Sequence, residues 1–390
     1  MIKQVKIEAL TPVHIGSGNK LPMNIEVVYN GSELGVVSLD KVVTHIDTDN
    51  IGKLTSVIES NENIWDFLKR YGVKSIKDIS KRTLEVWGSN IAQKKDLKEQ
   101  LLSSRGYPLL PGSSIKGAIR TALLANMINT NDRIAKDVLS QYRRKTPSHL
   151  WKLRDFQNME RSIVNKYFNG TEKPNANKDI MRFLQITDAE FEYKTIGTNV
   201  KILNLERNGW TYKNRGDQIT EAIGAGSETQ IRIKTDTDLL NKNIEKRTIS
   251  ANIDTSFLLS INDIFYIINA HTESLLNREI ENWEEEIEQT NINGQVTEAL
   301  NNYLDGLKDL QEQLSELDKK KECILRIGGN TGWDFITGAW IKNKSDLLND
   351  NEWENLYKQL NKSRNVNIYP KTRKIDEDGD FFGFVKMEIV

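Results

Sequence analysis

The chain has 390 residues, with 54 Lys and Arg against 55 Asp and Glu and a net charge of −1 at pH 7. This length can hold two or three domains with a large core. The balanced charge excludes a uniformly basic nucleic-acid-binding protein, so any such surface must be a local patch. A single cysteine and four histidines exclude a disulfide framework and the usual zinc-ligand spacings, and we expect a cytoplasmic protein without a metal or cofactor.

The first elements along the chain are predicted β-strands. Residues 5–9 alternate apolar and charged side chains, which is typical of a half-buried strand and leaves no apolar core for a signal peptide. The loop His14-Ile-Gly-Ser-Gly18 follows, and residues 25–29 alternate again. Asn30-Gly31 then predicts a hairpin turn into a further strand over residues 35–39.

Residues from about 40 to 105 differ in character from the strands before them. They are rich in charged residues, have a sequence pattern typical of helices and contain two tryptophans, Trp65 and Trp87. We interpret this stretch as a helical insertion that precedes the next motif. Farther on, the most apolar window of the chain, residues 256–270, is too short to span a bilayer, so no membrane partner is expected.

The next motif is the run from Pro108 to Leu124, in which a Pro-Gly turn precedes two serines and a helix. Ser113 or Ser114 is predicted to cap the first free amides, which point outward at the positive end of the helix dipole. Lys116 and Arg120 follow one turn apart. The arrangement is suited to an anionic ligand, most often a phosphate. The alternative is that the two cations belong to a solvated helix face.

Two common nucleotide-binding motifs are excluded. Ala118 and Ile119 stand where a P-loop needs Lys and Ser or Thr, so no side chain is placed to reach the phosphates or to hold magnesium. The dinucleotide fingerprint also fails, because neither Gly16-Ser-Gly18 nor Gly224-Ala-Gly226 is followed by the third glycine.

Charge is unevenly distributed along the chain. Residues 113–154 carry nine Lys or Arg against two Asp, a difference of +7, whereas residues 279–288 are acidic. Such segregation suits an anionic ligand on one face and a protein contact on another, although ordinary helix surface explains it equally well.

The second half of the chain predicts further strands and two long helices. Strands are expected over residues 183–187, 229–234, 323–327 and 383–390, and helices over residues 258–288 and 295–320. The pattern predicts an α+β fold of two ferredoxin-like (RNA-recognition-type) units with large helical insertions. We expect an N-terminal domain over residues 1–235, with the insertion at about 40–105, and a more degenerate C-terminal domain over residues 236–390.

Three motifs follow one another in a distinctive order. Thr11-Pro-Val-His-Ile-Gly-Ser-Gly18 comes after the first strand, Leu110-Pro-Gly-Ser-Ser-Ile-Lys-Gly-Ala-Ile-Arg120 follows, and the glycine loop Gly328-Gly-Asn-Thr-Gly-Trp333 comes late. In this order and in its strand framework the chain resembles the RAMP superfamily of CRISPR proteins. Its length and helical insertions are most similar to the type III-A (Csm) subunit that caps the backbone of the effector complex, over the 3′ portion of the guide RNA.

The resemblance implies a protein that binds single-stranded guide RNA through glycine loops and basic residues, with little reading of bases. Lys116 and Arg120 would contact phosphates, and His14 and Trp333 would either stack on bases or anchor their loops. The implied partners are other type III-A subunits, above all the adjacent backbone subunit, and nucleases that trim the guide. The implied RNA-binding residues are His14, Gly16, Ser17, Gly18, Gly112, Ser113, Ser114, Lys116, Arg120, Gly328, Gly329, Gly332 and Trp333.

One departure from the family's pattern concerns catalysis. Relatives that cut target RNA carry an aspartate in the loop after the His-Ile-Gly motif, whereas residues 11–25 contain no Asp or Glu. We therefore predict a non-catalytic subunit that caps the complex and supports guide maturation. Two alternatives remain open. One is a metal-independent, repeat-processing endoribonuclease with His14 as general base and Lys116 stabilising charge. The other is an interaction scaffold whose glycine loops are only turns.

Overall fold

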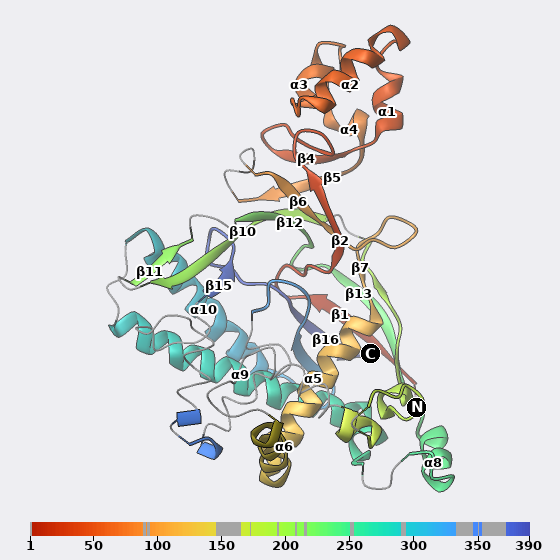
Figure 1. Cartoon of the computed structure of the whole chain (residues 1–390), viewed down its shortest axis with the longest axis vertical. Helices are drawn as coiled ribbons and strands as arrows, with labels where there is room; N and C mark the ends of the chain where they lie inside the picture. Colours follow the sequence, from red (N-terminus) through yellow and green to blue (C-terminus); the bar gives the residue numbers. More distant parts are fainter. Residues whose placement is uncertain are drawn as a thin grey trace.

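The structure is a computed structural model, and it describes residues 2–88, 91, 94–145, 165–171, 173–192, 195–206, 209–213, 217–249, 253–289, 294–332, 346–349, 351–352 and 372–390 (Figure 1). Two large sheets, a small helical head and a set of longer helices make up these ranges. The predicted mixture of helices and strands is confirmed.

The first sheet contains the N-terminal strand. Its order is β14–β16–β1–β13–β8, and all neighbouring strands are antiparallel. The strands are β1 (Ile2–Ala9), β8 (Leu184–Ile186), β13 (Glu228–Thr235), β14 (Glu322–Arg326) and β16 (Phe384–Ile389). Val5, Ile7 and Ala9 of β1 are fully buried, because side chains of a strand alternate between its two faces.

Strands from both sides of the expected boundary at residue 235 pair within this sheet. β1 lies between β13, from the expected N-terminal domain, and β16, from the expected C-terminal domain. The two expected domains therefore share a sheet and its core. Local alternation predicted each of these strands but carries no information on which distant strand it pairs with.

The second sheet is mixed and lies beside the first. Its main path is β2–β6–β12–β10–β5–β4–β3, and β11 and β15 also pair with β10. The pairs β10–β5 and β12–β6 are parallel. Its strands are β2 (Gly16–Pro22), β3 (Val27–Tyr29), β4 (Glu33–Val37), β5 (Ser80–Trp87), β6 (Asp96–Gln100), β10 (Thr195–Glu206), β11 (Gly209–Tyr212), β12 (Gln218–Ile223) and β15 (Thr372–Ile375). A separate pair is formed by β7 (Leu109–Leu110) and β9 (Ala189–Glu190).

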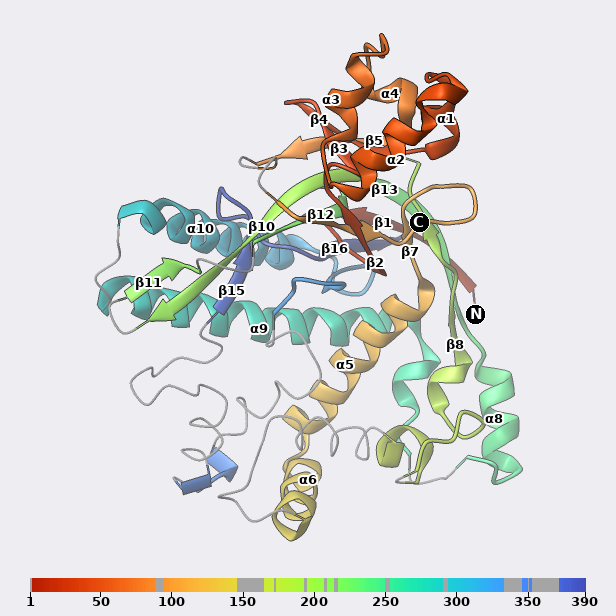
Figure 2. The same ribbon diagram turned by 45° about the horizontal axis from the view of Figure 1, so that its top comes forward.

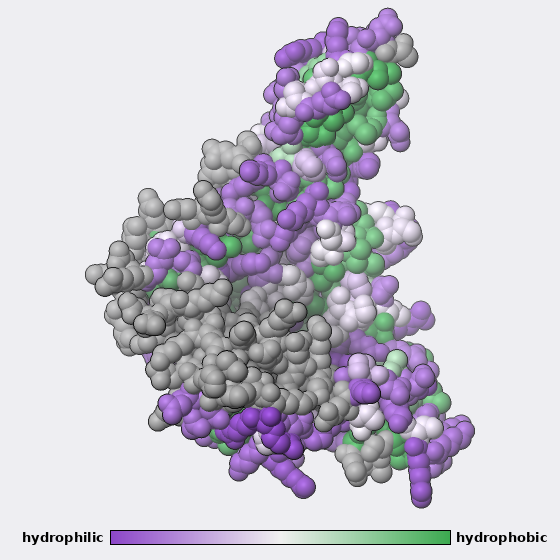
Figure 3. All heavy atoms as spheres, viewed as in Figure 1, coloured by the Kyte–Doolittle hydropathy of each residue, from purple (hydrophilic) through white to green (hydrophobic). Residues whose placement is uncertain are grey.

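A small helical head projects from the end of the second sheet, between β4 and β5 (Figures 1 and 2). It has its own apolar core and leaves some apolar side chains on its surface, drawn in green in Figure 3. Its elements are α1 (Leu39–Thr44), the 3-10 turn η1 (Thr48–Asn50), α2 (Ile51–Glu59), α3 (Ile64–Lys69) and α4 (Ile76–Ile79).

The head is shorter than the helical insertion that we predicted over about residues 40–105. Residues 80–87 and 96–100 are strands of the second sheet, so the prediction is wrong for this part. The alternation of apolar and polar residues is interrupted there, because the charged side chains of Arg82 and Glu99 are largely buried and pair with each other. The hairpin predicted at Asn30-Gly31 is confirmed as the connection between β3 and β4, and Gly31 has a φ of +105°.

Two of the remaining helices, α5 and α9, pack against the first sheet. α5 crosses α9 on one side of this sheet, and α9 and α10 form a long antiparallel pair (Figure 2). The last two confirm the helices predicted from residues 258 and 295. None of the helices in the described ranges combines the length and the hydropathy that a bilayer span requires. The bounds are α5 (Gly112–Thr130), α6 (Asp132–Lys145), η4 (Ile180–Phe183), α8 (Thr237–Glu245), η5 (Ser256–Leu259), α9 (Ile261–Gln289) and α10 (Gly294–Glu316).

Candidate nucleic-acid interface

The first and third glycine loops, far apart in the sequence, meet at the backbone of His14. The amide of Gly329 donates a hydrogen bond to the His14 carbonyl oxygen over 2.8 Å. Gly328 also lies against this oxygen and leaves no room for a side chain, because a Cβ added there would stand only 2.5 Å from it. Its φ of +91° also favours glycine. The two loops therefore form one continuous feature, which we call the loop junction (residues 14–20 and 328–332).

The His14 ring is buried inside the loop junction, with an exposed fraction of 6%. Its Nδ1 donates to the main-chain oxygen of Glu221 over 2.7 Å, which leaves Nε2 as the acceptor nitrogen toward Gly16. Burial lowers the pKa of His14, so the ring is neutral at pH 7. Of the two roles considered for His14, the geometry matches the loop anchor.

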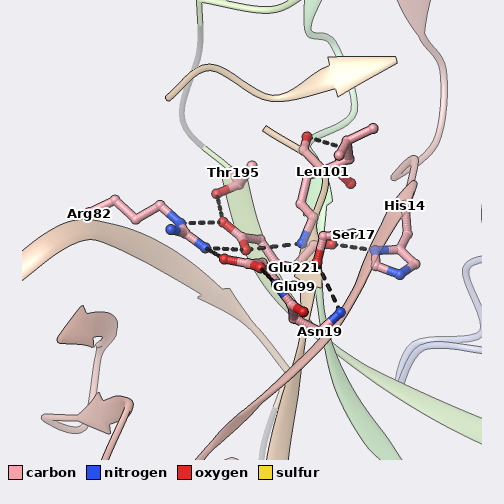
Figure 4. A network of polar contacts seen from close by, with 9 residues as sticks. His14, Ser17, Asn19, Arg82, Glu99, Leu101, Thr195 and Glu221 are labelled. Carbon is pink, nitrogen blue, oxygen red and sulfur yellow. Dashed lines mark hydrogen bonds and ion pairs between the residues drawn. The ribbon is translucent and has the colours of Figure 1, made fainter. Parts of the chain in front are cut away.

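A buried carboxylate, Glu221 on β12, organises the strands beneath the first loop (Figure 4). Arg82 of β5 donates to both carboxylate oxygens over 2.8 and 2.9 Å. The Thr195 hydroxyl and the main-chain amide of Gln100 donate over 2.7 and 3.1 Å. This bidentate, fully hydrogen-bonded arrangement is the condition under which a buried charge is tolerated.

A second carboxylate, Glu99, connects this network to the first loop (Figure 4). It accepts hydrogen bonds from Arg82 over 3.0 Å, from the Ser17 hydroxyl over 3.0 Å and from the Asn19 amide over 2.8 Å. Burial acts to raise the pKa of Glu99, but the hydrogen bonds outweigh burial and lower it. The side chain of Ser17, predicted to face RNA, thus donates to a carboxylate of β6.

Gln100 links the first loop to the segment before the second motif. Its side-chain oxygen accepts from the Ile15 amide over 2.9 Å, and its side-chain nitrogen donates to the Leu109 carbonyl oxygen over 3.1 Å. Leu109 belongs to β7, which leads directly into α5. The loop junction and the start of α5 are therefore connected through one buried glutamine.

At the start of α5, the predicted serine cap is wrong. Pro111 is the N-cap residue, and the Gly112 amide donates to the side chain of Asp188 over 2.8 Å. Ser113 and Ser114 lie inside the first turn, where Ser113 is exposed. Asp188 lies far from the motif in the sequence. The motif alone therefore could not show that the Gly112 amide, expected to bind an external anion, already donates to a carboxylate of the same chain.

The two cations of α5 have different surroundings. Arg120 is paired with Asp179, and its guanidinium lies 5.3 Å from the centroid of the Phe168 ring. Burial lowers the pKa of Lys116, partly offset by Asp179. No carboxylate of the described ranges lies within ion-pair distance of Lys116. Of the two, Lys116 is the better placed for an external anion.

The remaining predicted residues are mostly loop backbone. Gly16, Gly18, Gly328 and Gly332 are exposed, and Gly18 and Gly332 have positive φ angles with open space where a Cβ would stand. Trp333 lies outside the described residues. Within the part of the chain that the structure describes, no group of three His, Cys, Asp or Glu side chains could hold a metal ion.

Sequence reasoning missed the polar residues that support the first loop, namely Arg82, Glu99, Gln100 and Glu221. The first three fall in the stretch that we interpreted as a helical insertion. A usable signal was present for Glu221, because a single acid stands among Ile219, Thr220, Ala222 and Ile223 in a strand-like segment.

The sequence matches the RAMP superfamily over residues 6–335. Among curated proteins it is similar to a CRISPR system Cms protein Csm5 from Methanocaldococcus jannaschii, with 26% identity over 259 residues. The match covers 63% of this chain and 55% of that relative, so the chain spans only about half of the relative's length.

Two solved structures share the fold over the whole chain. One is a chain of a Csm-crRNA-target RNA ternary complex of a type III-A CRISPR-Cas system, with a TM-score of 0.65 and 19% identity. That match covers 100% of both chains. The other is Csm5 of T. onnurineus, with a TM-score of 0.67 and 16% identity, covering 99% of this chain and 100% of that one.

Proposed function

Because the chain belongs to the RAMP superfamily, we propose that it is a non-catalytic guide-RNA-binding subunit of a type III-A CRISPR effector complex. It caps the backbone at the 3′ end of the guide and supports guide maturation. The observation that carries this proposal is the loop junction, where two glycine loops from opposite ends of the chain meet at the His14 backbone. Similarity over the whole chain to a subunit of a Csm-crRNA-target RNA complex supports it.

The topology of the first sheet supports one ferredoxin-like unit with insertions. In chain order its elements are β1, α5, β8, β13, α9 and β16, and four of the strands pair in the order β16–β1–β13–β8. This is the β-α-β-β-α-β arrangement with antiparallel neighbours. We assign the first RNA-recognition-type unit to this sheet and its two helices, with the second sheet as a large addition.

The exposed backbone of the loop junction suits the phosphate chain of a single-stranded RNA. Four glycines of the junction are exposed and carry no side chain, namely Gly16, Gly18, Gly328 and Gly332. The sugar-phosphate backbone of an RNA can therefore approach their amides whatever its base sequence. Successive amides in glycine turns bind anions without reading bases. A guide must accept many spacer sequences, and a groove with few base contacts meets that need.

The environment of His14 favours the non-catalytic assignment over the endoribonuclease alternative. Residues 11–25 contain no Asp or Glu that could act in cleavage. The His14 ring is buried and hydrogen-bonded to a main-chain oxygen, so it is placed to hold two loops rather than to take a proton from a ribose hydroxyl. The proposed partners are the guide RNA, the adjacent backbone subunit and the nucleases that trim the guide.

The proposal is tested by purifying the effector complex through another tagged subunit, from the native host and from a strain that lacks this chain. Sequencing of the bound RNA should give guides with a shared repeat-derived 5′ end and defined 3′ ends in the first case. Without this chain, the 3′ ends should be longer or heterogeneous. Complexes with identical 3′ ends in both strains, or native complexes that contain no copy of this chain, would overturn the proposal.

A further inference from the structure

Three lysines lie in or beside the loop junction. Lys20 on β2 lies directly opposite Lys98 on β6 in the antiparallel register. Lys374, on β15, donates a hydrogen bond from Nζ to the side-chain oxygen of Asn330 in the third loop, over 3.1 Å. The charges of Lys98 and Lys374 reach the His14 ring and, after burial, help to lower its pKa, and Lys20 faces Lys98. We call this group, Lys20, Lys98 and Lys374, the lysine cluster.

The lysine cluster is costly for the folded protein by itself. Like charges directly opposite on neighbouring strands destabilise a sheet. Burial and then Lys20 lower the pKa of Lys98, and burial and then Lys98 lower the pKa of Lys374. No described residue places a carboxylate within ion-pair distance of these three ammonium groups. Many other lysines of the chain are paired, for example Lys6 with Glu228 over 2.7 Å.

Asn330 adds an unused hydrogen-bond donor beside the cluster. Its exposed fraction is 8%, and its φ is +66°, a conformation rare for residues other than glycine. The Lys374 ammonium fixes the amide orientation, because it needs an acceptor and so faces the Asn330 oxygen. The Asn330 nitrogen is buried and has no partner among the described residues.

These observations deepen the proposed function and rest on it. We infer that Lys20, Lys98 and Lys374 bind a phosphodiester of the guide RNA backbone at the loop junction, with Asn330 as an additional donor. A phosphate oxygen accepts from several donors at once, and lysine binds it as a point charge. Clustered cations and glycine-loop amides around one position fit a phosphate, and binding offsets the repulsion among the three ammonium groups.

The test compares a Lys98→Met/Lys374→Met variant of the full chain with the wild type in binding a fluorescent 40-nucleotide single-stranded RNA. Loss of the contact to this one phosphate should reduce the slope of log affinity against log salt by about 0.7. Between about 50 and about 200 mM KCl, the wild-type affinity should therefore fall about 2.6-fold more than that of the variant. The matched control is Lys53→Met/Lys242→Met, which removes the same charge from exposed positions of α2 and α8 and should keep the wild-type slope.

Thermal melts without RNA show whether the variant is folded. A variant with the wild-type slope would overturn the inference while leaving the proposed function intact. Equal slope losses in the variant and in the control would also overturn it, because the effect would then reflect net charge. A wild-type chain that binds no RNA would overturn the proposed function and this inference together.

Discussion

Replacement of Gly328 by alanine tests whether the two glycine loops must touch. A Cβ at Gly328 would lie 2.5 Å from the His14 carbonyl oxygen, a main-chain atom that cannot rotate away. Gly328 also has a φ of +91°, which costs a residue with a side chain about 1 to 3 kcal/mol. Relieving the overlap adds about 1 to 3 kcal/mol. We expect Gly328→Ala to lower the free energy of unfolding by about 2 to 6 kcal/mol.

The matched control is Gly31→Ala, in the turn between β3 and β4. Gly31 has a φ of +105°, yet no atom lies within 4 Å of the position where its Cβ would stand. This variant therefore carries the conformational cost without the overlap and should lose only about 1 to 3 kcal/mol. Urea unfolding followed by fluorescence measures both, and RNA affinity should fall only for Gly328→Ala. Equal losses of stability and an unchanged affinity for Gly328→Ala would refute the close approach of the loops.

The remaining predictions concern the network beneath the loop junction and the start of α5. Glu221→Gln should lower the unfolding free energy by about 1 to 3 kcal/mol, measured by urea denaturation, because Arg82 loses one of its two carboxylate partners and keeps only Glu99. The lowered pKa of His14 means that its neutral form contributes stability above its unfolded pKa, about 6.5, and loses it as pH falls. Below about pH 6.5 the wild type should therefore lose up to about 1.4 kcal/mol per pH unit relative to His14→Gln. Asp188→Ala should cost about 1 kcal/mol in thermal melts, because the Gly112 amide loses its acceptor.

Each of these predictions has its own control. Glu85→Gln, at an exposed position of β5, should change stability little, and equal effects of the two glutamines would argue against a buried charge pair. Parallel pH profiles for the wild type and His14→Gln would contradict the burial of a neutral ring. Asp188→Asn retains an acceptor oxygen and should stay close to the wild type. A loss as large as that of Asp188→Ala would show that charge, rather than capping, is what matters there.

The elements that could be predicted from the sequence are those specified by local patterns. β1 and β13 alternate with period 2, α9 and α10 carry long apolar stripes, and Asn30-Gly31 is a strong hairpin signal. The glycine loops were also recognisable, since glycine marks places where the backbone turns sharply or comes close to another group.

What could not be predicted depends on contacts between distant segments. β5 and β6 looked helical because Arg82 and Glu99 point toward each other inside the sheet, which breaks the usual separation of charged and apolar faces. The acceptor for the Gly112 amide is Asp188, far along the chain, whereas the local pattern predicts a serine cap. No local pattern predicts the hydrogen bond between the Gly329 amide and the His14 carbonyl oxygen either, because the two residues are far apart in the sequence.

The most direct test of the central claim is to map ultraviolet cross-links between the guide RNA and this chain in the assembled effector complex. Mass spectrometry of the cross-linked peptides, with sequencing of the attached RNA, identifies both partners of each contact. The account predicts cross-links from residues 14–20 and 328–332 to nucleotides in the 3′ portion of the guide. Cross-links confined to other surfaces of the chain, or to the 5′ portion of the guide, would contradict it.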